Sequence, residues 1–469
     1  MYDVIIVCVI SAIAVVAASW VKQKGSKKFP PGSRGLPFLG SVPFVLGSLE
    51  RTLAVWGWQN YGPVFFFTRG NTRTVVLNTY EAASEGFVKQ GNHLSGRFID
   101  ANHNELFADY SPQWQEQRKL RVKTLKGFGK VNTEEIMTSE CKKMICRIRE
   151  TKGSFEAGYY LAVPTFNIVK SIIYGEPSEG MNKQDEVNLS KVLADPVYKA
   201  GNGFMEFMAG MFPQIRSSVA YERMLEKKGK ERVRQVKEKM TGSKKLIEGM
   251  LQNLQDWETG EVYNNQQLSC YLTDLFMAGT DTMATTVHWS LVFLAQNPQV
   301  QEKMAAEVKS VAGNDVITTS MMDSMPYTRA VMHESSRLRP VFPLSLRHQA
   351  TSDVTVKDYV IPTGTSVVAN LWAIQNDPKW WKQPSEFRPE RHVTEDGGFT
   401  KSEKIVPFSI GPRYCLGSQI AIYQQFIFLT NLVRGFRFRF DQDKVEPDLT
   451  GLMTSVLAPV NVHLVAEER

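Results

Sequence analysis

The sequence has few cysteines and histidines, and this scarcity excludes several kinds of site. Five cysteines and seven histidines occur among 469 residues. No two cysteines form a Cys-x-x-Cys pair, and Cys141 and Cys146 are poorly spaced for zinc. An odd, scattered set also argues against a disulfide framework. We therefore expect the bulk of the chain to lie in a reducing compartment.

The sequence also lacks a strong excess of one charge. Its 55 basic and 48 acidic side chains leave a net charge of +7. This mild excess is compatible with an anionic membrane surface or an acidic partner, but it is too diffuse to indicate nucleic acid. With 43% hydrophobic and 22% charged residues, the composition is that of a globular protein with a sizeable core.

A long apolar run is present at the N-terminus, from Val4 to Trp20. As a helix it spans about 26 Å, close to the ~27 Å core of the endoplasmic reticulum bilayer. Asp3 precedes it, and the positive charges come after it, at Lys22, Lys24, Lys27 and Lys28. A cleaved signal peptide would carry its positive charge in front. We therefore expect a single-pass membrane anchor with the rest of the chain in the cytosol.

Patterning along the chain predicts a mainly α protein with a minor β portion. "VFFFTRG" and "TRTVVLN" resemble two strands around a Gly-Asn turn, and "TVKDYVIPTGTSVVANL" resembles further strands. From about Glu81 the pattern is largely helical, and the range Leu268–Pro298 predicts one long central helix. We expect the two sequence-distant β pieces to share one sheet in a single domain.

Cys415 stands in "FSIGPRYCLG", directly before an apolar helical pattern. A nucleophilic cysteine would need a base, and a zinc ligand would need partners. An inert core thiol would not need glycines around it, whereas Gly411 and Gly417 allow the backbone to approach something flat and large. The helix N-terminus favours the thiolate. A thiolate without a second protein ligand suits the proximal ligand of a haem iron.

These residues resemble the haem-binding signature of the cytochrome P-450 family, F-x-x-G-x-R-x-C-x-G, at every fixed position. Four more blocks match in the expected order, and the N-terminal run with "PPGSRGLPFLG" is similar to the microsomal animal type that hydroxylates drugs and steroids. The resemblance implies haem b with Cys415 as axial thiolate and metal ligand. It also implies a membrane anchor at 1–21, a basic and Pro/Gly-rich elbow at 22–40 and a cytochrome P-450 catalytic domain at 41–469.

The block "AGTDT" lies near the centre of the expected long helix. Gly279 either permits close helix packing or marks a local widening of the helix that leaves room for O₂ and water. The resemblance assigns Thr282 and Asp281 to proton delivery during oxygen activation. Met283 departs from the Thr or Ser that is common in the family, which concerns the details of that relay.

A further pair of blocks, "ESSR" and "FRPERH", implies a structural triad by resemblance. Glu334 and Arg337 share a helix face, and the family pairs them with the arginine of the second block, here Arg391. We expect this triad to hold the cysteine loop. His392 stands where Phe or Trp is commoner, which concerns local packing.

Five residues match positions that bind the haem propionates in the microsomal type. Buried carboxylates need cations or donors, and the resemblance supplies these as Arg97, Trp114, Arg118, His348 and Arg413. Arg347 departs from the usual proline before the histidine. This arginine either adds a propionate contact or reaches solvent.

The resemblance also places a substrate pocket and a redox partner. The pocket residues are apolar, which fits a lipophilic substrate; they are Phe98, Ile99, Phe107, Ala278, Phe342, Leu344, Leu346, Leu452 and Val456. A basic patch would dock NADPH–cytochrome P-450 reductase, with cytochrome b5 as a possible second partner. The expected members of this patch are Arg118, Lys119, Arg121, Lys123, Lys126, Lys130, Lys401 and Lys404.

Two activities of different kinds fit these residues. The first is a monooxygenase that inserts one oxygen atom of O₂ into a lipophilic substrate with electrons from NADPH. The alternative is a haem-thiolate isomerase or dehydratase that acts on a lipid peroxide without O₂ or reductase. The Asp281-Thr282 pair favours the first, because oxygen activation needs proton delivery. A haem-binding protein without enzymatic activity and a cysteine hydrolase are further alternatives.

Overall fold

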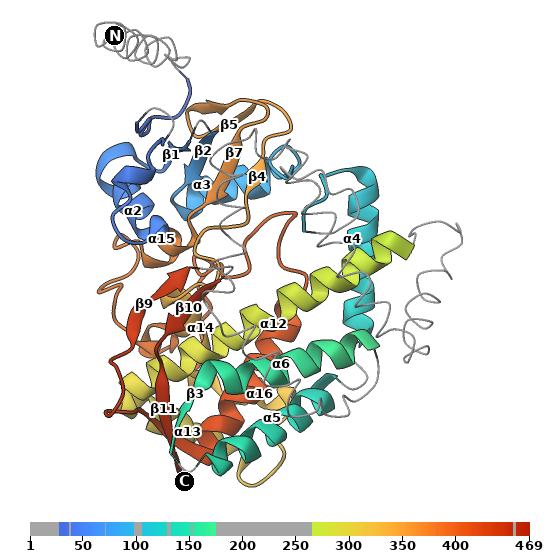
Figure 1. The fold of residues 1–469 in the computed structure, drawn as a ribbon, viewed down its shortest axis with the longest axis vertical. Coiled ribbons are helices and arrows are strands. Elements are labelled where there is room, and N and C mark those ends of the chain that lie inside the picture. Colours follow the sequence, from blue (N-terminus) through green and yellow to red (C-terminus); the bar gives the residue numbers. More distant parts are fainter. Residues whose placement is uncertain are drawn as a thin grey trace, which may run out of the picture.

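A computed structural model describes residues 28–36, 39–70, 72–97, 106–128, 133–151, 153–174, 265–453 and 456–469. A small β-rich part, which is uppermost in Figure 1, lies against a larger helical part. Within these ranges no helix combines the length and apolar character that crossing a bilayer requires. The expected anchor at 1–21 lies outside the described residues.

The β-rich part is built on a sheet with the order β1-β2-β7-β4. Strands β1 (Val64–Arg69) and β2 (Thr72–Leu77) form an antiparallel hairpin. Strand β7 (Ser366–Ala369) pairs parallel to β2, and β4 (His348–Gln349) pairs antiparallel to β7. The predicted hairpin and the predicted sharing of one sheet by distant β pieces are therefore confirmed.

Both faces of the β1–β2 hairpin are buried, which explains its continuous Val, Phe and Leu content. Phe66 and Leu77 pack with Phe87 on one face. Phe65 packs with Leu53 on the other. The alternation follows from the two-residue period of a strand. The face that holds Phe87 matters for the site, because Phe87 contacts the cysteine loop.

The helical part is organised around α12 (Asn265–Gln296), which runs diagonally through it in Figure 1. This confirms the long central helix expected at 268–298. The helix ends before Asn297 and Pro298, and Pro298 begins α13 (Pro298–Ala312), as expected for proline at a first helical position. The C-terminal half of α12 is buried and packs against α6 (Ala157–Tyr174) and α16 (Ser418–Gly435).

The remaining elements complete these two parts. Smaller sheets join β3 with β11 and β8, β9 with β10, and β5 with β6. The other helices and turns are η1 (Val42–Phe44), α2 (Leu49–Trp56), η2 (Gly57–Tyr61), α3 (Tyr80–Ser84), η3 (Glu85–Lys89), α4 (Pro112–Phe128), α5 (Thr133–Glu150), η4 (Thr319–Ser324), α14 (Pro326–Leu338), α15 (Leu371–Asn376) and η5 (Pro389–His392). The other strands are β3 (Ser154–Glu156), β5 (Val354–Val356), β6 (Tyr359–Ile361), β8 (Phe436–Phe440), β9 (Asp448–Met453), β10 (Leu457–Val460) and β11 (His463–Glu468).

Candidate active site

The loop before α16 carries Cys415 and is fixed by its own backbone. The N–H of Cys415 donates to the carbonyl oxygen of Phe408 at 3.0 Å. Gly411 has φ +81°, and a Cβ there would lie 1.8 Å from the carbonyl oxygen of Phe87. Only glycine fits this position. Gly417, in contrast, has φ −85°, and no atom lies within 4 Å of a Cβ built on it.

The thiol of Cys415 is accessible, although protein atoms surround it closely enough to desolvate it. Burial raises its pKa, while N–H groups of Gly417 and Ser418 and the charge of Arg118 act in the opposite direction. The expected thiolate-favouring N–H groups are therefore present, but burial outweighs them. A metal cation would shift this balance, because a coordinating thiol is deprotonated. The residues thus fit a thiolate ligand of a bound metal.

The segment Ala278–Thr282 lies within an uninterrupted α-helix. The hydroxyl of Thr282 donates to the carbonyl oxygen of Ala278 at 2.5 Å. A Cβ at Gly279 would lie 2.8 Å from Cγ2 of Val169 in α6. Of the two explanations for Gly279, close helix packing is therefore supported, and the local widening is not observed.

The residues of this segment differ in how exposed they are. Asp281 and Thr282 are half-buried, and Ala278 is exposed even though the following turns of α12 are buried. Met283 is buried in the protein. An exposed alanine in the middle of this helix leaves its face accessible.

Three of the expected propionate partners, Arg97, His348 and Arg413, form a polar cluster in which Arg97 and His348 are buried and Arg413 is half-buried. Arg97 donates from Nε to Leu106 O at 2.9 Å and from Nη1 to Arg347 O at 2.8 Å. His348 donates from Nδ1 to a backbone carbonyl, Leu94 O. Its pKa is well below the ordinary value because of burial, then because of the charges of Arg97 and Arg413. The arginine cations gathered here fit the two carboxylates of a haem.

The other two expected partners join this cluster through an aromatic ring. The guanidinium carbons of Arg413 and Arg118 lie 4.0 and 5.2 Å from the centroid of the Trp114 ring. Arg118 also donates to the carbonyl oxygen of Tyr414, next to the cysteine. The structure therefore brings all five residues together around the cysteine loop. Arg347 contributes its backbone carbonyl, as the acceptor from Arg97.

The expected substrate residues range from exposed to fully buried. Phe98 and Ile99 lie outside the described residues. Leu346 is exposed and Phe342 half-buried, whereas Val456 is fully buried and belongs to the core environment. The other expected positions are exposed or half-buried, namely Phe107, Ala278, Leu344 and Leu452.

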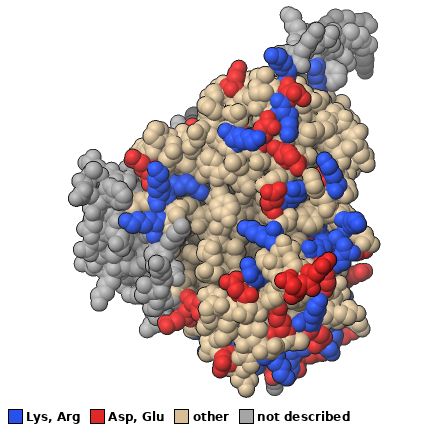
Figure 2. Space-filling view, turned by 180° about the vertical axis from the view of Figure 1, so that it is seen from behind, with Lys and Arg blue, Asp and Glu red and all other residues tan. Residues whose placement is uncertain are grey.

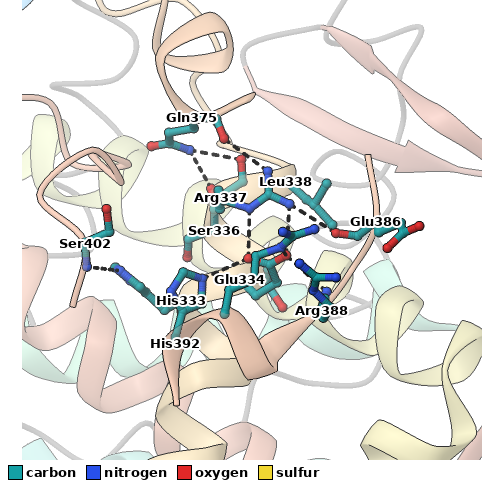
Figure 3. A network of polar contacts seen from close by, with 12 residues as sticks. His333, Glu334, Ser336, Arg337, Leu338, Gln375, Glu386, Arg388, His392 and Ser402 are labelled. Atoms are coloured by element: carbon teal, nitrogen blue, oxygen red, sulfur yellow. Dashed lines mark hydrogen bonds and ion pairs between the residues drawn. The ribbon is translucent and has the colours of Figure 1, made fainter. Parts of the chain in front are cut away.

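The expected triad is present, and His392 joins it through a contact that the sequence did not predict (Figure 3). The Glu334 carboxylate accepts from Arg337 at 2.8 and 2.9 Å and from Arg391 at 3.2 Å. It also accepts from His392 Nε2 at 2.9 Å. Burial disfavours the charged carboxylate of Glu334 and so raises its pKa. Hydrogen bonds from His392 and Arg337 outweigh this effect and lower the pKa to about 2. In the sequence, the only sign of this contact was the histidine at 392 in place of the commoner Phe or Trp.

The neighbouring residues His333 and Gln375 also reach the segment before the cysteine loop. His333 Nε2 accepts from Ser402 N–H, and Gln375 Oε1 accepts from Val406 N–H. No motif in the sequence marked either residue.

Comparison with known proteins matches the Cytochrome P450 family model over residues 30–465. Cytochrome P450 2J2 of Homo sapiens is 30% identical over 482 residues, covering 96% of this chain and 94% of the relative. Cytochrome P450 2A4 of Mus musculus is also 30% identical, covering 94% of each chain. The resemblance indicated by the motifs and the expected fold is confirmed: the chain belongs to the cytochrome P450 family and is a cytochrome P450 monooxygenase.

Proposed function

We propose that this protein inserts one oxygen atom of O₂ into a lipophilic organic substrate, by hydroxylation or epoxidation, using NADPH-derived electrons from a reductase. The observation that carries the proposal is the accessible Cys415 thiol just before α16, beside a cluster of arginines that includes Arg118 and the buried Arg97. This pairing fits a flat cofactor with an iron at its centre and carboxylates at its edge.

The proposed cofactor is haem b, which supplies the oxygen-activating chemistry when bound. Cys415 would ligate its iron through Sγ. The carboxylates would be held by Arg97, Arg118 and Arg413 and by Trp114, whose ring lies against two of these arginines. His348 lies in the same cluster, close to Arg97 and Arg413. Gly417 would leave room for the flat macrocycle. A Cβ at 417 would meet no protein atom within 4 Å, so no contact within the protein requires a glycine there.

Thr282 and Asp281 would deliver protons for the oxygen-activating chemistry. The Thr282 hydroxyl proton is directed at the carbonyl oxygen of Ala278. Its oxygen therefore keeps lone pairs that accept a hydrogen bond from a proton-carrying water. The half-buried carboxyl of Asp281 would exchange protons with solvent. The apolar residues near this segment would favour a lipophilic substrate and exclude bulk water.

The proposed electron donor is NADPH–cytochrome P-450 reductase at the endoplasmic reticulum membrane, with cytochrome b5 as a second partner. Lys119 and Lys123 are exposed on α4 and suit an acidic flavin domain. One expected member of the patch, Arg121, is wrong because it is buried. Lys404 is half-buried, with Nζ 4.2 Å from the centroid of the Trp380 ring and 5.2 Å from that of the Tyr80 ring. Charges are interspersed over the face drawn in Figure 2, which shows no continuous field of one sign among the described residues.

The test is the optical spectrum of the dithionite-reduced protein with carbon monoxide, for wild type and Cys415→Ala. We expect a strongly red-shifted Soret band in wild type and its loss in the variant. Folded wild type without haem absorbance would overturn the proposal. Product formation that requires neither O₂ nor NADPH would support the isomerase or dehydratase instead.

A further inference from the structure

Glu334 in α14 is enclosed by donors from two segments. Its Oε1 accepts from Arg337 Nη2, from Arg391 Nε and from the backbone N–H of Arg388 at 3.1 Å. Its Oε2 accepts from Arg337 Nε and from His392 Nε2. The side chains of Glu334, Arg337 and His392 are at most 2% exposed. His392 is thus a full member of a buried polar cluster.

The contact with Glu334 determines where the proton of His392 resides. Because the pKa of Glu334 is about 2, its carboxylate can only accept at neutral pH. His392 Nε2 must therefore carry a hydrogen and donate it. The ring of His392 meets the ring of His333 edge to face, with centroids 4.8 Å apart and planes inclined by 73°. The ring of His392 therefore packs directly against His333, the residue before Glu334 in α14.

His333 in turn holds the backbone of the segment that leads to the cysteine. Its Nε2 accepts from the N–H of Ser402 at 3.2 Å. Burial lowers the pKa of His333 to about 3, so its ring is neutral and keeps an acceptor nitrogen. Figure 3 shows this order of contacts, from Glu334 through His392 and His333 to Ser402.

A second, parallel attachment uses Gln375 of α15. Its Nε2 donates to Ser336 O at 2.8 Å, and its Oε1 accepts from Val406 N–H at 2.8 Å. The same end of α14 therefore holds the segment at Ser402 and at Val406. From Val406 the backbone continues directly into the cysteine loop, where Ser409 N–H donates to Val406 O at 3.0 Å.

We propose that His392 is a positioning residue for Cys415. With His333 it connects the Glu334 cluster to Ser402 and so fixes the segment 402–406 from which the cysteine loop begins. A phenylalanine at 392 would fill much of the same space, but it could not donate to Glu334. The role is therefore specific to the histidine in this chain. The proposal rests on the proposed haem ligation only for the carbon monoxide spectrum, which reports on Cys415 through the iron.

The decisive comparison is His392→Phe against His392→Gln. Phe keeps much of the volume and removes the donor, whereas Gln keeps a donor. Glu390→Gln is the matched control, because Glu390 lies in the same η5 turn but contacts Tyr327 and Lys303 instead. Amide hydrogen exchange of the purified holoprotein is measured over residues 402–415. This readout does not depend on how the iron is ligated.

We expect His392→Phe to speed exchange over 402–415 by about tenfold, with α16 unchanged, and His392→Gln to restore part of the protection. In the carbon monoxide complex, His392→Phe should lose the red-shifted Soret band several-fold faster than wild type. Glu390→Gln should match wild type in both. Unchanged exchange in His392→Phe, or equal acceleration throughout the protein, would overturn the proposal.

A second variant keeps the proposal testable if His392→Phe does not fold. His333→Leu removes the acceptor for Ser402 and leaves the Glu334 hydrogen bonds in place. It should speed exchange at 402–406 to a similar extent. If residues 402–406 stay as protected as in wild type, the connection through His333 is wrong. If wild type contains no haem at all, the proposed function fails, while the exchange result still decides the role of His392.

Discussion

The guanidinium of Arg413 lies 4.0 Å from the centroid of the Trp114 ring and donates from Nη2 to Ser95 O at 2.8 Å. The arginine is therefore held in place before any cofactor carboxylate reaches it. Pre-orientation lowers the entropy cost of binding an anion. Arg413→Met should keep the fold and weaken haem retention.

We expect Arg413→Met to release haem roughly tenfold faster, which corresponds to about 1.4 kcal/mol of lost interaction. The measurement is the rate of haem transfer to excess apomyoglobin. Arg329→Met serves as the control, because Arg329 forms an exposed ion pair with Asp323. Equal release rates in Arg413→Met and wild type would remove Arg413 from the haem site.

The two glycines that flank Cys415 should respond differently to alanine. Gly411 has a positive φ and would bring a Cβ to 1.8 Å from Phe87 O, so the loop must move. Gly411→Ala should abolish the red-shifted carbon monoxide band. Gly417→Ala meets no protein atom within 4 Å and should fold normally as apoprotein, with haem uptake reduced. Normal haem content in Gly417→Ala would contradict the proposed role of Gly417 beside the macrocycle.

The cysteine loop could be predicted from sequence because its chemistry is local. A fixed pattern of glycines and an arginine surrounds Cys415 within ten residues. The long central helix followed from a sustained apolar pattern and ended, as expected, near Pro298. The shared sheet was expected from two short β pieces far apart in the sequence, and the parallel pairing of β2 with β7 confirms it.

The remainder of the site depends on contacts between residues far apart in the chain. His392 was noted only as an unusual residue, because its partner Glu334 is 58 positions away. The basic patch was partly wrong for a similar reason. Charge density along "RKLRVK" does not reveal that Arg121 faces inward against Tyr271, with 4.9 Å between guanidinium carbon and ring centroid.

The packing of Gly279 against α6 gives a further prediction. A Cβ at 279 would approach Val169 Cγ2 to 2.8 Å, and valine has little freedom to move. Gly279→Ala should therefore lower the free energy of unfolding by about 1–2 kcal/mol, after the gain in helix propensity is counted. Val169→Ala should reverse most of this loss in the double variant. Urea denaturation of wild type, the two single variants and the double variant gives the coupling free energy between the two positions. Additive effects would exclude this contact as the cause.

An exposed ion-pair group gives a prediction about pH. Hydrogen bonds from Arg469, partly offset by burial, and then from Arg437 lower the pKa of Glu302 to about 2. A lowered carboxyl pKa stabilises the fold above the unfolded value near 4.5 and loses that effect as pH falls toward 2. Glu302→Gln should reduce the melting temperature by roughly 1 °C at pH 7. The difference should shrink between pH 5 and pH 3 and in high salt, and a constant difference would contradict the ion-pair explanation.

Arg339 attaches the hairpin of β9 and β10 to the helical part. Its Nε and Nη2 donate to Leu449 O at 3.1 and 2.7 Å, and Trp289 Nε1 donates to Leu457 O at 2.8 Å. The hairpin carries Leu452, one of the expected substrate contacts. Arg339→Met removes both donors to β9, while Trp289 still holds β10. The variant should therefore loosen the apolar side of the proposed substrate pocket without disturbing the cysteine loop.

The test is a spectral titration with two azoles that ligate haem iron, imidazole and 4-phenylimidazole. We expect Arg339→Met to weaken the binding of 4-phenylimidazole by about three- to tenfold, because the phenyl ring of this ligand needs an ordered apolar wall. Imidazole affinity and the carbon monoxide band should stay unchanged. Equal losses for both azoles would mean that the substitution acts on the haem itself. Unchanged affinity for both would show that the hairpin does not line the pocket.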